Sequence, residues 1–150
     1  MQTFLPYESF EDTAKVLDYR RLGKQRVEGM QIINTIQTPK SKGWANHPIV
    51  KMWRPYVPAL KLYTNIIITE WISRGYNNNM EFYDTSGVEY PDWLGNNEFH
   101  ASHRANLIRK DFDWYSQYKW SENSESPYVW RDENLDWYQQ QVGTKERVYL

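Results

Sequence analysis

The sequence predicts an all-α fold, a compact bundle of three main helices with long loops and an aromatic C-terminal tail. Apolar residues recur at helical spacing in three stretches, residues 9–37, 48–74 and 97–111. Proline and glycine stand between those stretches and stop helices there. With 150 residues, of which 40% are hydrophobic, the chain suits a single domain with one core over residues 1–150.

The first predicted helix begins after Ser9 or Asp12, either of which can cap it, and runs to about Gln37. The segment 38–43 ends it with a proline and a glycine. Gly23 in mid-helix costs about 1 kcal/mol relative to alanine, so we expect another backbone or a ligand to come close there. One stripe at helical spacing is expected to face the core: Val16, Gly23, Val27, Met30 and Asn34.

The second predicted helix begins near Pro48 or Pro55 and runs to Arg74, with Gly75 as its C-cap. Residues 60–71 are apolar on nearly every side, which is typical of a central, enclosed helix. The three isoleucines within that stretch would also suit a strand, but the good helix formers on both sides favour a helix.

Residues 76–95 predict a long irregular loop, because they hold a run of asparagines, a Ser-Gly pair and a proline. The third helix begins after Asn96 or Asn97 and ends near Asp111, and a short aromatic segment follows it. The tail from residue 121 is expected to wrap the core, with a short helix near residues 133–141.

Composition limits the function classes. The net charge is −1, so a nucleic-acid surface requires an uneven distribution of charge, and basic residues do crowd the segment Arg20–Arg26. The chain has no cysteine, which excludes disulfides, thiolate nucleophiles and cysteine-bound zinc. Its start lacks the basic and apolar runs of a signal peptide, and its most apolar stretch is too short to span a membrane. We therefore expect a soluble intracellular monomer with no membrane partner.

The basic segment is the first candidate site. Arg20 and Lys24 are four residues apart and share a helix face. Arg20 falls within the apolar stripe, and a cation there predicts an enclosed site for an anion such as phosphate. The alternative, equally supported, is a solvated face whose cations pair with Asp18 and Glu28.

Histidines and aromatic residues supply two further candidates. His100 and His103 share one helix face and His47 could approach them, and three histidines can hold a metal ion with an open position. Because Arg104 follows His103, we favour anion binding there and expect no metal. Cations followed by aromatic rings are typical of a surface that binds nucleic acid, where the rings stack on bases. The rings could instead pack into the hydrophobic core. The residues of this candidate are Arg109, Lys110, Trp114 and Tyr115.

Four segments in collinear order resemble the pyrimidine-dimer DNA glycosylases with AP-lyase activity, the endonuclease V type of UV repair enzyme. Asp18–Leu22 matches an acid-Tyr-Arg-Glu-Leu segment, and His47 matches a histidine just before the second helix. Glu70–Asn77 carries Arg-Gly-aromatic-Asn, and Phe112–Tyr118 is rich in Trp and Tyr. The similarity is closest to a branch that carries Arg-Arg-Leu-Gly-Lys-Gln-Arg, Asn-His-Pro and His-x-Ser-His-Arg, all present here.

The resemblance implies a bundle of three helices that acts on damaged or modified bases in duplex DNA, flips the nucleotide out, and needs no cofactor. In this family the N-terminal α-amine attacks the sugar C1′, and a Schiff base precedes β-elimination. An α-amine has a reference pKa of about 7.7–8.0 against about 10.4 for lysine, so more of it is free base at neutral pH. The catalytic candidates are Met1, Gln2, Arg21, Glu28 and His47.

Two positions depart from the family pattern. The essential glutamate of the family falls on Arg21, a cation, so we nominate Glu28, two turns further along nearly the same face, as the acid. Family members expose a threonine amine after removal of the initiator Met, whereas Gln2 follows Met1 here, and so large a side chain normally blocks that removal. The amine would then belong to Met1, one residue out of place.

The leading hypothesis is therefore a DNA glycosylase or AP lyase. A non-catalytic binder of damaged or modified DNA is the alternative, and a metal-dependent hydrolase that uses the three histidines is a third. The residues expected to contact DNA are Arg20, Arg21, Lys24, Gln25, Arg26, His100, His103, Arg104, Arg109, Lys110, Trp114 and Tyr115.

Overall fold

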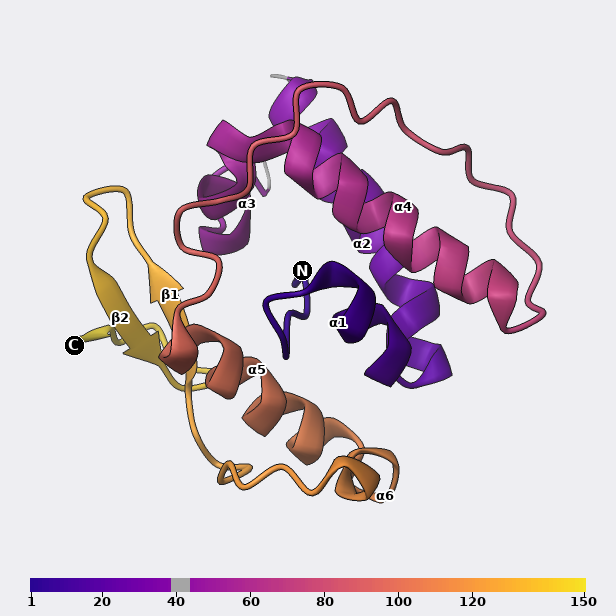
Figure 1. Ribbon diagram of the computed structural model, residues 1–150. Helices are drawn as coiled ribbons and strands as arrows, with labels where there is room; N and C mark the ends of the chain where they lie inside the picture. The colour runs from indigo at the N-terminus through magenta and orange to yellow at the C-terminus, as the bar shows by residue number, and fades with distance from the viewer. Residues whose placement is uncertain (39–43) are drawn as a thin grey trace.

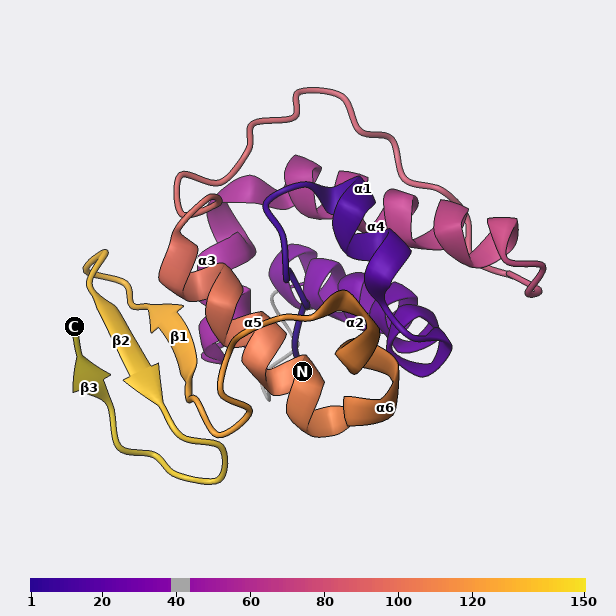
Figure 2. The ribbon, with the colours of Figure 1, turned by 60° about the horizontal axis from the view of Figure 1, so that its bottom comes forward.

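The computed structural model describes residues 1–38 and 44–150, and its helices surround the N-terminal segment of the chain (Figure 1). A small sheet made by the C-terminal residues packs at one end of the helices (Figure 2). The predicted stop of the first helix falls largely on residues 39–43, which lie outside the described residues. No helix in the described ranges has both the length and the apolarity to cross a bilayer.

The first predicted helix is in fact two helices, α1 (Phe10–Val16) and α2 (Tyr19–Gln37). Ser9 caps α1 as predicted, since its hydroxyl accepts a hydrogen bond from the backbone N–H of Asp12 at 3.1 Å. The chain then turns extended at Leu17, which is fully buried, and Asp18 caps α2. The prediction of a single continuous helix is wrong. The sequence does not distinguish an aspartate that caps a new helix, as Asp18 does, from an aspartate inside a helix.

The buried face of α2 also differs from the predicted stripe. Val27 and Asn34 are exposed, and Met30 is only partly buried. The close approach predicted at Gly23 is real, because a Cβ there would lie 2.8 Å from the ring of Trp71. Three polar residues belong to the face that packs inward, and a search for apolar periodicity does not detect them. The buried residues of α2 are Leu22, Gln25, Glu28, Gly29, Ile32, Ile33 and Thr35.

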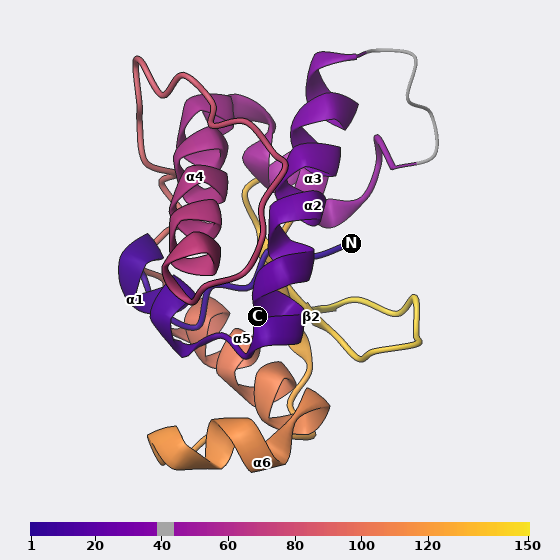
Figure 3. The same cartoon turned by 90° about the vertical axis from the view of Figure 1, so that its right-hand side faces the viewer.

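The second predicted helix begins at Pro48 but is interrupted. It forms α3 (Pro48–Trp53), a 3₁₀ turn η1 (Arg54–Tyr56) and α4 (Val57–Ser73), and Gly75 follows with φ of 92°. The isoleucine run is helical, as predicted, and α4 is central. It lies beside α2 over much of its length (Figures 1 and 3).

Residues 76–95 form the expected loop, which runs outside α4 (Figure 1). Helix α5 (Asn97–Lys110) follows, and the side chain of Asn96 caps it by accepting from the N–H of Phe99 at 2.9 Å. The aromatic segment then forms α6 (Phe112–Tyr115) and a 3₁₀ turn, η2 (Ser116–Tyr118).

The C-terminal tail contradicts the all-α prediction. It forms an antiparallel sheet of β1 (Tyr128–Arg131), β2 (Trp137–Gln140) and β3 (Val148–Tyr149) in that order, so the fold is mixed α and β. The short helix expected near residues 133–141 is therefore wrong. Aromatic and β-branched residues favour strands, and the pair Trp130 and Tyr138 is buried against the helices.

We predict that Gly29→Ala destabilises the protein by about 1–3 kcal/mol through overpacking, although alanine alone would favour the helix by about 1 kcal/mol. A Cβ at this position would lie 2.3 Å from Oγ1 of Thr64 on α4. Urea unfolding measures the change. Thr64→Ala removes the obstructing oxygen, so the double variant should recover part of the loss, and a stabilised Gly29→Ala protein would contradict the close packing of α2 on α4.

Candidate active site

Residues 1–6, the N-terminal arm, pass between α2, α4 and α5 in extended form (Figure 1). Thr3 and Leu5 are fully buried and Gln2 nearly so. A buried extended segment lies in no helix or sheet that would pair its backbone, so side chains must supply its hydrogen bonds.

Helices α2 and α4 provide part of that pairing. The amide of Gln25, 1% exposed, accepts from the N–H of Phe4 at 2.9 Å and donates to the carbonyl of Gln2 at 3.0 Å. The hydroxyl of Tyr63 donates to the carbonyl of Phe4 at 2.7 Å. Gln25 is predicted to contact DNA, and in the structure both ends of its amide are bound to the arm.

The motif His-x-x-His-Arg of α5 holds the arm from the other side. The imidazole of His100 donates from Nδ1 to the carbonyl of Leu5 at 2.8 Å, since its Nε2 accepts from the N–H of Gly95. His103 Nδ1 accepts from the N–H of Leu5 at 2.8 Å. Arg104 donates to the carbonyl of Pro6 at 2.7 Å. The predicted DNA-binding histidines are therefore buried in the framework.

The three histidines do not converge on a metal site. His47 caps α3 by accepting from the N–H of Ile49 at 3.2 Å, while His100 and His103 are bound to the arm. Among the residues that the structure describes, no group of three His, Asp or Glu could hold a metal ion. Burial lowers the pKa of His103 to about 3 and, with the charge of the N-terminal ammonium, that of His47 to about 4.

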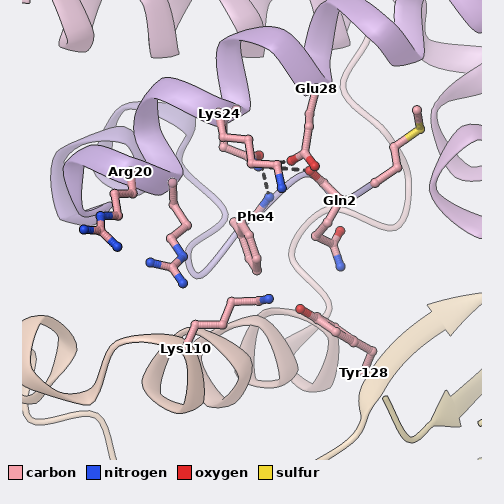
Figure 4. A pocket seen from close by; sticks show the side chains of 10 residues that line it. Gln2, Phe4, Arg20, Lys24, Glu28, Lys110 and Tyr128 are labelled. Carbon is pink, nitrogen blue, oxygen red and sulfur yellow. Dashed lines mark hydrogen bonds between the residues drawn. The ribbon is translucent and has the colours of Figure 1, made fainter. Parts of the chain in front are cut away.

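A cavity of about 360 Å³ opens between the arm, α2, the end of α5 and β1 (Figure 4). Four cations and one carboxylate, Glu28, stand in its wall. The cavity brings together several residues that the sequence predicts for the site, among them Met1, Arg21 and Glu28. Arg20 also lines it, but this residue is exposed and does not interrupt a buried apolar stripe. The lining residues are Met1, Gln2, Phe4, Arg20, Arg21, Lys24, Gln25, Glu28, Lys110 and Tyr128.

Glu28 is the buried acid of the cavity. It is 8% exposed and accepts a hydrogen bond from Nε2 of Gln25 at 2.7 Å. Burial raises the pKa of Glu28, while the N-terminal ammonium, Lys24 and the Gln25 bond partly oppose that rise. A carboxyl group with a raised pKa can exchange a proton nearer neutral pH than an ordinary glutamate.

Arg21 is held at the cavity edge through a second buried acid. Its guanidinium donates to Asp18 at 3.2 Å, and the hydroxyl of Tyr115 donates to the same carboxylate at 2.5 Å. Tyr115, one of the rings expected to stack on DNA, is fully buried, and burial together with Asp18 raises its pKa. In this position the Tyr115 side chain supports the start of α2, and its ring forms no part of an exposed stacking surface.

Other candidates lie away from this cavity. Arg26 stacks on Trp71 at 4.3 Å from the ring centre and donates to Asn78 at 2.7 Å. The indole of Trp114 donates to the carbonyl of Val16 at 2.7 Å, and Arg109 is partly buried and lines neither of the cavities at the arm.

A second cavity of about 300 Å³ lies on the other side of the N-terminus. Met1, Gln2, Lys110 and Tyr128 line both cavities, so the N-terminus stands between them. His47 lines only the second one, together with Trp130 and the turn at residues 140–144.

Residues 1–84 match a family model described as pyrimidine dimer DNA glycosylase. The chain belongs to this family. Membership supports a role like that of a DNA repair glycosylase, and the family implies DNA as the substrate. Comparisons with curated proteins and with solved structures found no match. The matched part of the chain includes the arm and α2 but ends before α5, so Lys110, Tyr128 and the segment Phe112–Tyr118 lie beyond it.

We predict that the free energy of unfolding falls as the pH drops below about 6.5, the ordinary value for histidine. Between that pH and about 3 the unfolded chain protonates His103 while the folded chain keeps it neutral. Each such group contributes a slope of at most about 1.4 kcal/mol per pH unit, and none above pH 6.5.

Denaturant unfolding at several pH values measures this slope. His103→Gln keeps an acceptor for the N–H of Leu5 and removes the titrating ring, so its slope should be shallower than that of the wild type. Equal slopes for the two proteins would show that His103 is not buried in neutral form.

Proposed function

We propose that this protein is a DNA glycosylase with AP-lyase activity, which flips a damaged or modified nucleotide out of duplex DNA into the cavity beside the N-terminal arm. One observation carries the proposal: amines, a buried carboxylate and a row of cations line a single cavity. The family match supports the DNA repair role independently.

The size and charge of the cavity suit a nucleotide. Its volume of about 360 Å³ falls in the range usual for small-ligand sites. Arg20 and Arg21 stand on the first turn of α2 and Lys24 on the next, and all three can bind the phosphates that flank an extruded nucleotide. Unstacking costs least for a base that is already damaged, which favours such bases over normal ones.

The proposed chemistry uses an amine and Glu28. The amine attacks C1′ of the sugar, the base leaves, and the resulting Schiff base allows loss of the C2′ proton and of the 3′ phosphate. Glu28 exchanges protons during these steps and steadies the cationic intermediate. The α-amine at Met1 is the candidate that the family resemblance implies, and Lys110 supplies a second amine in the same wall.

We also propose that residues 1–150 act as one domain. Lys110 of α5 and Tyr128 of β1 complete the cavity that α2 and the arm begin.

A binder of damaged DNA without turnover is the second candidate. Arg21 favours it, because this cation stands where the family carries its glutamate and is paired with Asp18. Incubation with UV-irradiated and abasic duplexes separates the two functions. The glycosylase predicts base release and strand cleavage, whereas tight binding with no turnover on either substrate would support the binder and contradict the enzyme.

We predict that Glu28→Gln slows turnover by about 10²- to 10⁴-fold, because the proton-transfer group is lost while the shape is kept. DNA affinity should change little, and a gel-shift assay measures it in parallel. Glu81→Gln is the matched control, since Glu81 is exposed on the loop and lines no cavity at the arm. Full turnover by Glu28→Gln would remove Glu28 from the mechanism.

We predict that Lys24→Gln weakens binding to any duplex sequence and reduces the slope of log K against log salt by about 1, since one phosphate contact is lost. Fluorescence titrations across a range of salt concentrations measure both quantities. Lys61→Gln on α4 is the control and should leave the slope unchanged, because Lys61 lies over the Tyr83 ring and not at the cavity. Identical slopes for all three proteins would place the DNA elsewhere.

A further inference from the structure

Lys110 and Tyr128 form one wall of the cavity beside the N-terminal arm. Lys110 is the last residue of α5 and Tyr128 the first of β1, and both also line the second cavity. Figure 4 shows the ammonium and the phenol hydroxyl reaching into the first cavity, across from the carboxylate of Glu28. Two groups that can donate hydrogen bonds therefore stand on the side of the cavity opposite the buried acid.

The Lys110 ammonium is not engaged in a salt bridge. Among the residues that the structure describes, no carboxylate lies within ion-pair distance of its nitrogen. Burial lowers the pKa of Lys110, and neighbouring cations, Arg21 first among them, lower it further. An ammonium carries three donors and no acceptor, so a ligand oxygen with negative charge would relieve both effects.

The Tyr128 hydroxyl is held in place as a donor. Its ring packs edge-on against the buried ring of His103, with 5.9 Å between centroids. Burial raises the pKa of Tyr128, while hydrogen bonds from Gln2 and Arg109 act in the opposite direction. A hydrogen bond lowers the pKa of a phenol when the phenol oxygen accepts it, so the proton of the hydroxyl is left for a ligand.

The amine and the acid of the proposed chemistry stand on the other side of the cavity. Burial raises the pKa of Glu28, and the N-terminal ammonium opposes that rise more strongly than any other group. The α-amine of Met1 is therefore close to this carboxylate. A nucleophile and a leaving group occupy opposite faces of the carbon at which they exchange, so a sugar attacked from the Glu28 side expels its base toward Lys110 and Tyr128.

We propose that Lys110 and Tyr128 bind a carbonyl oxygen of the departing base and stabilise the negative charge that the base acquires. This inference rests on the proposed glycosylase function and keeps the α-amine of Met1 as the candidate nucleophile. It assigns a catalytic role to two residues beyond the part of the chain that matches the family model. Donors that are fixed where charge develops in the transition state act most strongly in a site withdrawn from water.

The base that fits this wall is a pyrimidine. A pyrimidine carries its C2 carbonyl directly beside the glycosidic nitrogen, so charge released onto that nitrogen spreads to the carbonyl oxygen. A purine has no carbonyl next to its glycosidic nitrogen. The exposed cations of α2, Arg20 and Lys24, remain free to bind the flanking phosphates.

Every electron pair in the proposed step is accounted for. The lone pair of the α-amine forms the bond to C1′, and the pair that joined C1′ to the base nitrogen moves onto the base. The base becomes an anion with part of its charge on the C2 oxygen, where the two donors bind. The attacking nitrogen becomes cationic and gives up a proton through Glu28, and the base takes up one proton as it leaves. Base removal therefore needs no co-reactant.

Two substrates separate this role from a phosphate contact or a structural role. A UV-irradiated duplex contains both a leaving base and flanking phosphates, whereas an abasic duplex contains the phosphates alone. Stabilisation of the base anion can speed only the first reaction. Single-turnover rates with excess protein are measured for cleavage of the glycosidic bond in the UV-irradiated duplex and for strand cleavage in the abasic duplex.

We expect Tyr128→Phe, which removes only the hydroxyl, to slow glycosidic cleavage by about 10²- to 10³-fold, as the loss of one fixed donor does in other enzymes. Lys110→Gln should have an effect of similar size, and Lys110→Arg, which keeps a charged donor, should retain more activity. Strand cleavage of the abasic duplex should change little in all three variants. Thermal unfolding confirms that each variant is folded.

The matched controls are Tyr90→Phe and Lys61→Gln, which should keep both rates, because neither residue lines a cavity at the arm. Equal losses on the two substrates, or unchanged glycosidic cleavage, would overturn the inference for the residue concerned. A wild-type protein that cleaves only the abasic duplex would also overturn it and leave the lyase function in place. If the wild type cleaves neither substrate, the proposed function fails together with the inference.

Discussion

The backbone of the N-terminal arm is buried, and the rest of the structure depends on how its hydrogen bonds are satisfied. Gln25 of α2 and Tyr63 of α4 bind the groups of Gln2 and Phe4, while His100 and His103 of α5 bind both the carbonyl and the N–H of Leu5. A buried polar group that loses its partner costs about 1–3 kcal/mol, so each bond fixes one helix against the arm. Three helices that are distant in sequence are thereby held around one extended segment.

The same constraint builds the cavity. Because the arm is fixed from Gln2 onward, the N-terminus must emerge beside the basic face of α2, and the gap between α2 and α5 becomes a space lined by charge. Gln25 links the two features, since its amide binds the arm and also donates to Glu28. Arg21 is positioned in turn by Asp18 and Tyr115. The residues whose hydrogen bonds hold the structure together therefore also position the candidate catalytic groups.

Local signals predicted the helices well and the long-range arrangement poorly. Caps and prolines located α5 and most of α4, whereas the break before α2 and the C-terminal sheet depend on tertiary contacts of Leu17 and Tyr138 that no local pattern contains. The basic residues of α2 were identified, although on an incorrect apolar stripe. The role of His100 and His103 was missed because their partner, Leu5, lies more than ninety positions away. Gln25 and Glu28, two polar residues three positions apart among inward-facing apolar ones, are a sequence signal that could have located the buried site.

In the proposed function, the cavity beside the N-terminal arm receives the sugar of a damaged nucleotide. A crystal structure of the protein bound to a duplex with a tetrahydrofuran abasic analogue tests it without requiring turnover. We expect the analogue to lie in the cavity between Glu28 and Lys110, with its flanking phosphates on Arg20, Arg21 or Lys24. A duplex bound to another face of the protein, with its abasic site outside this cavity, would contradict it.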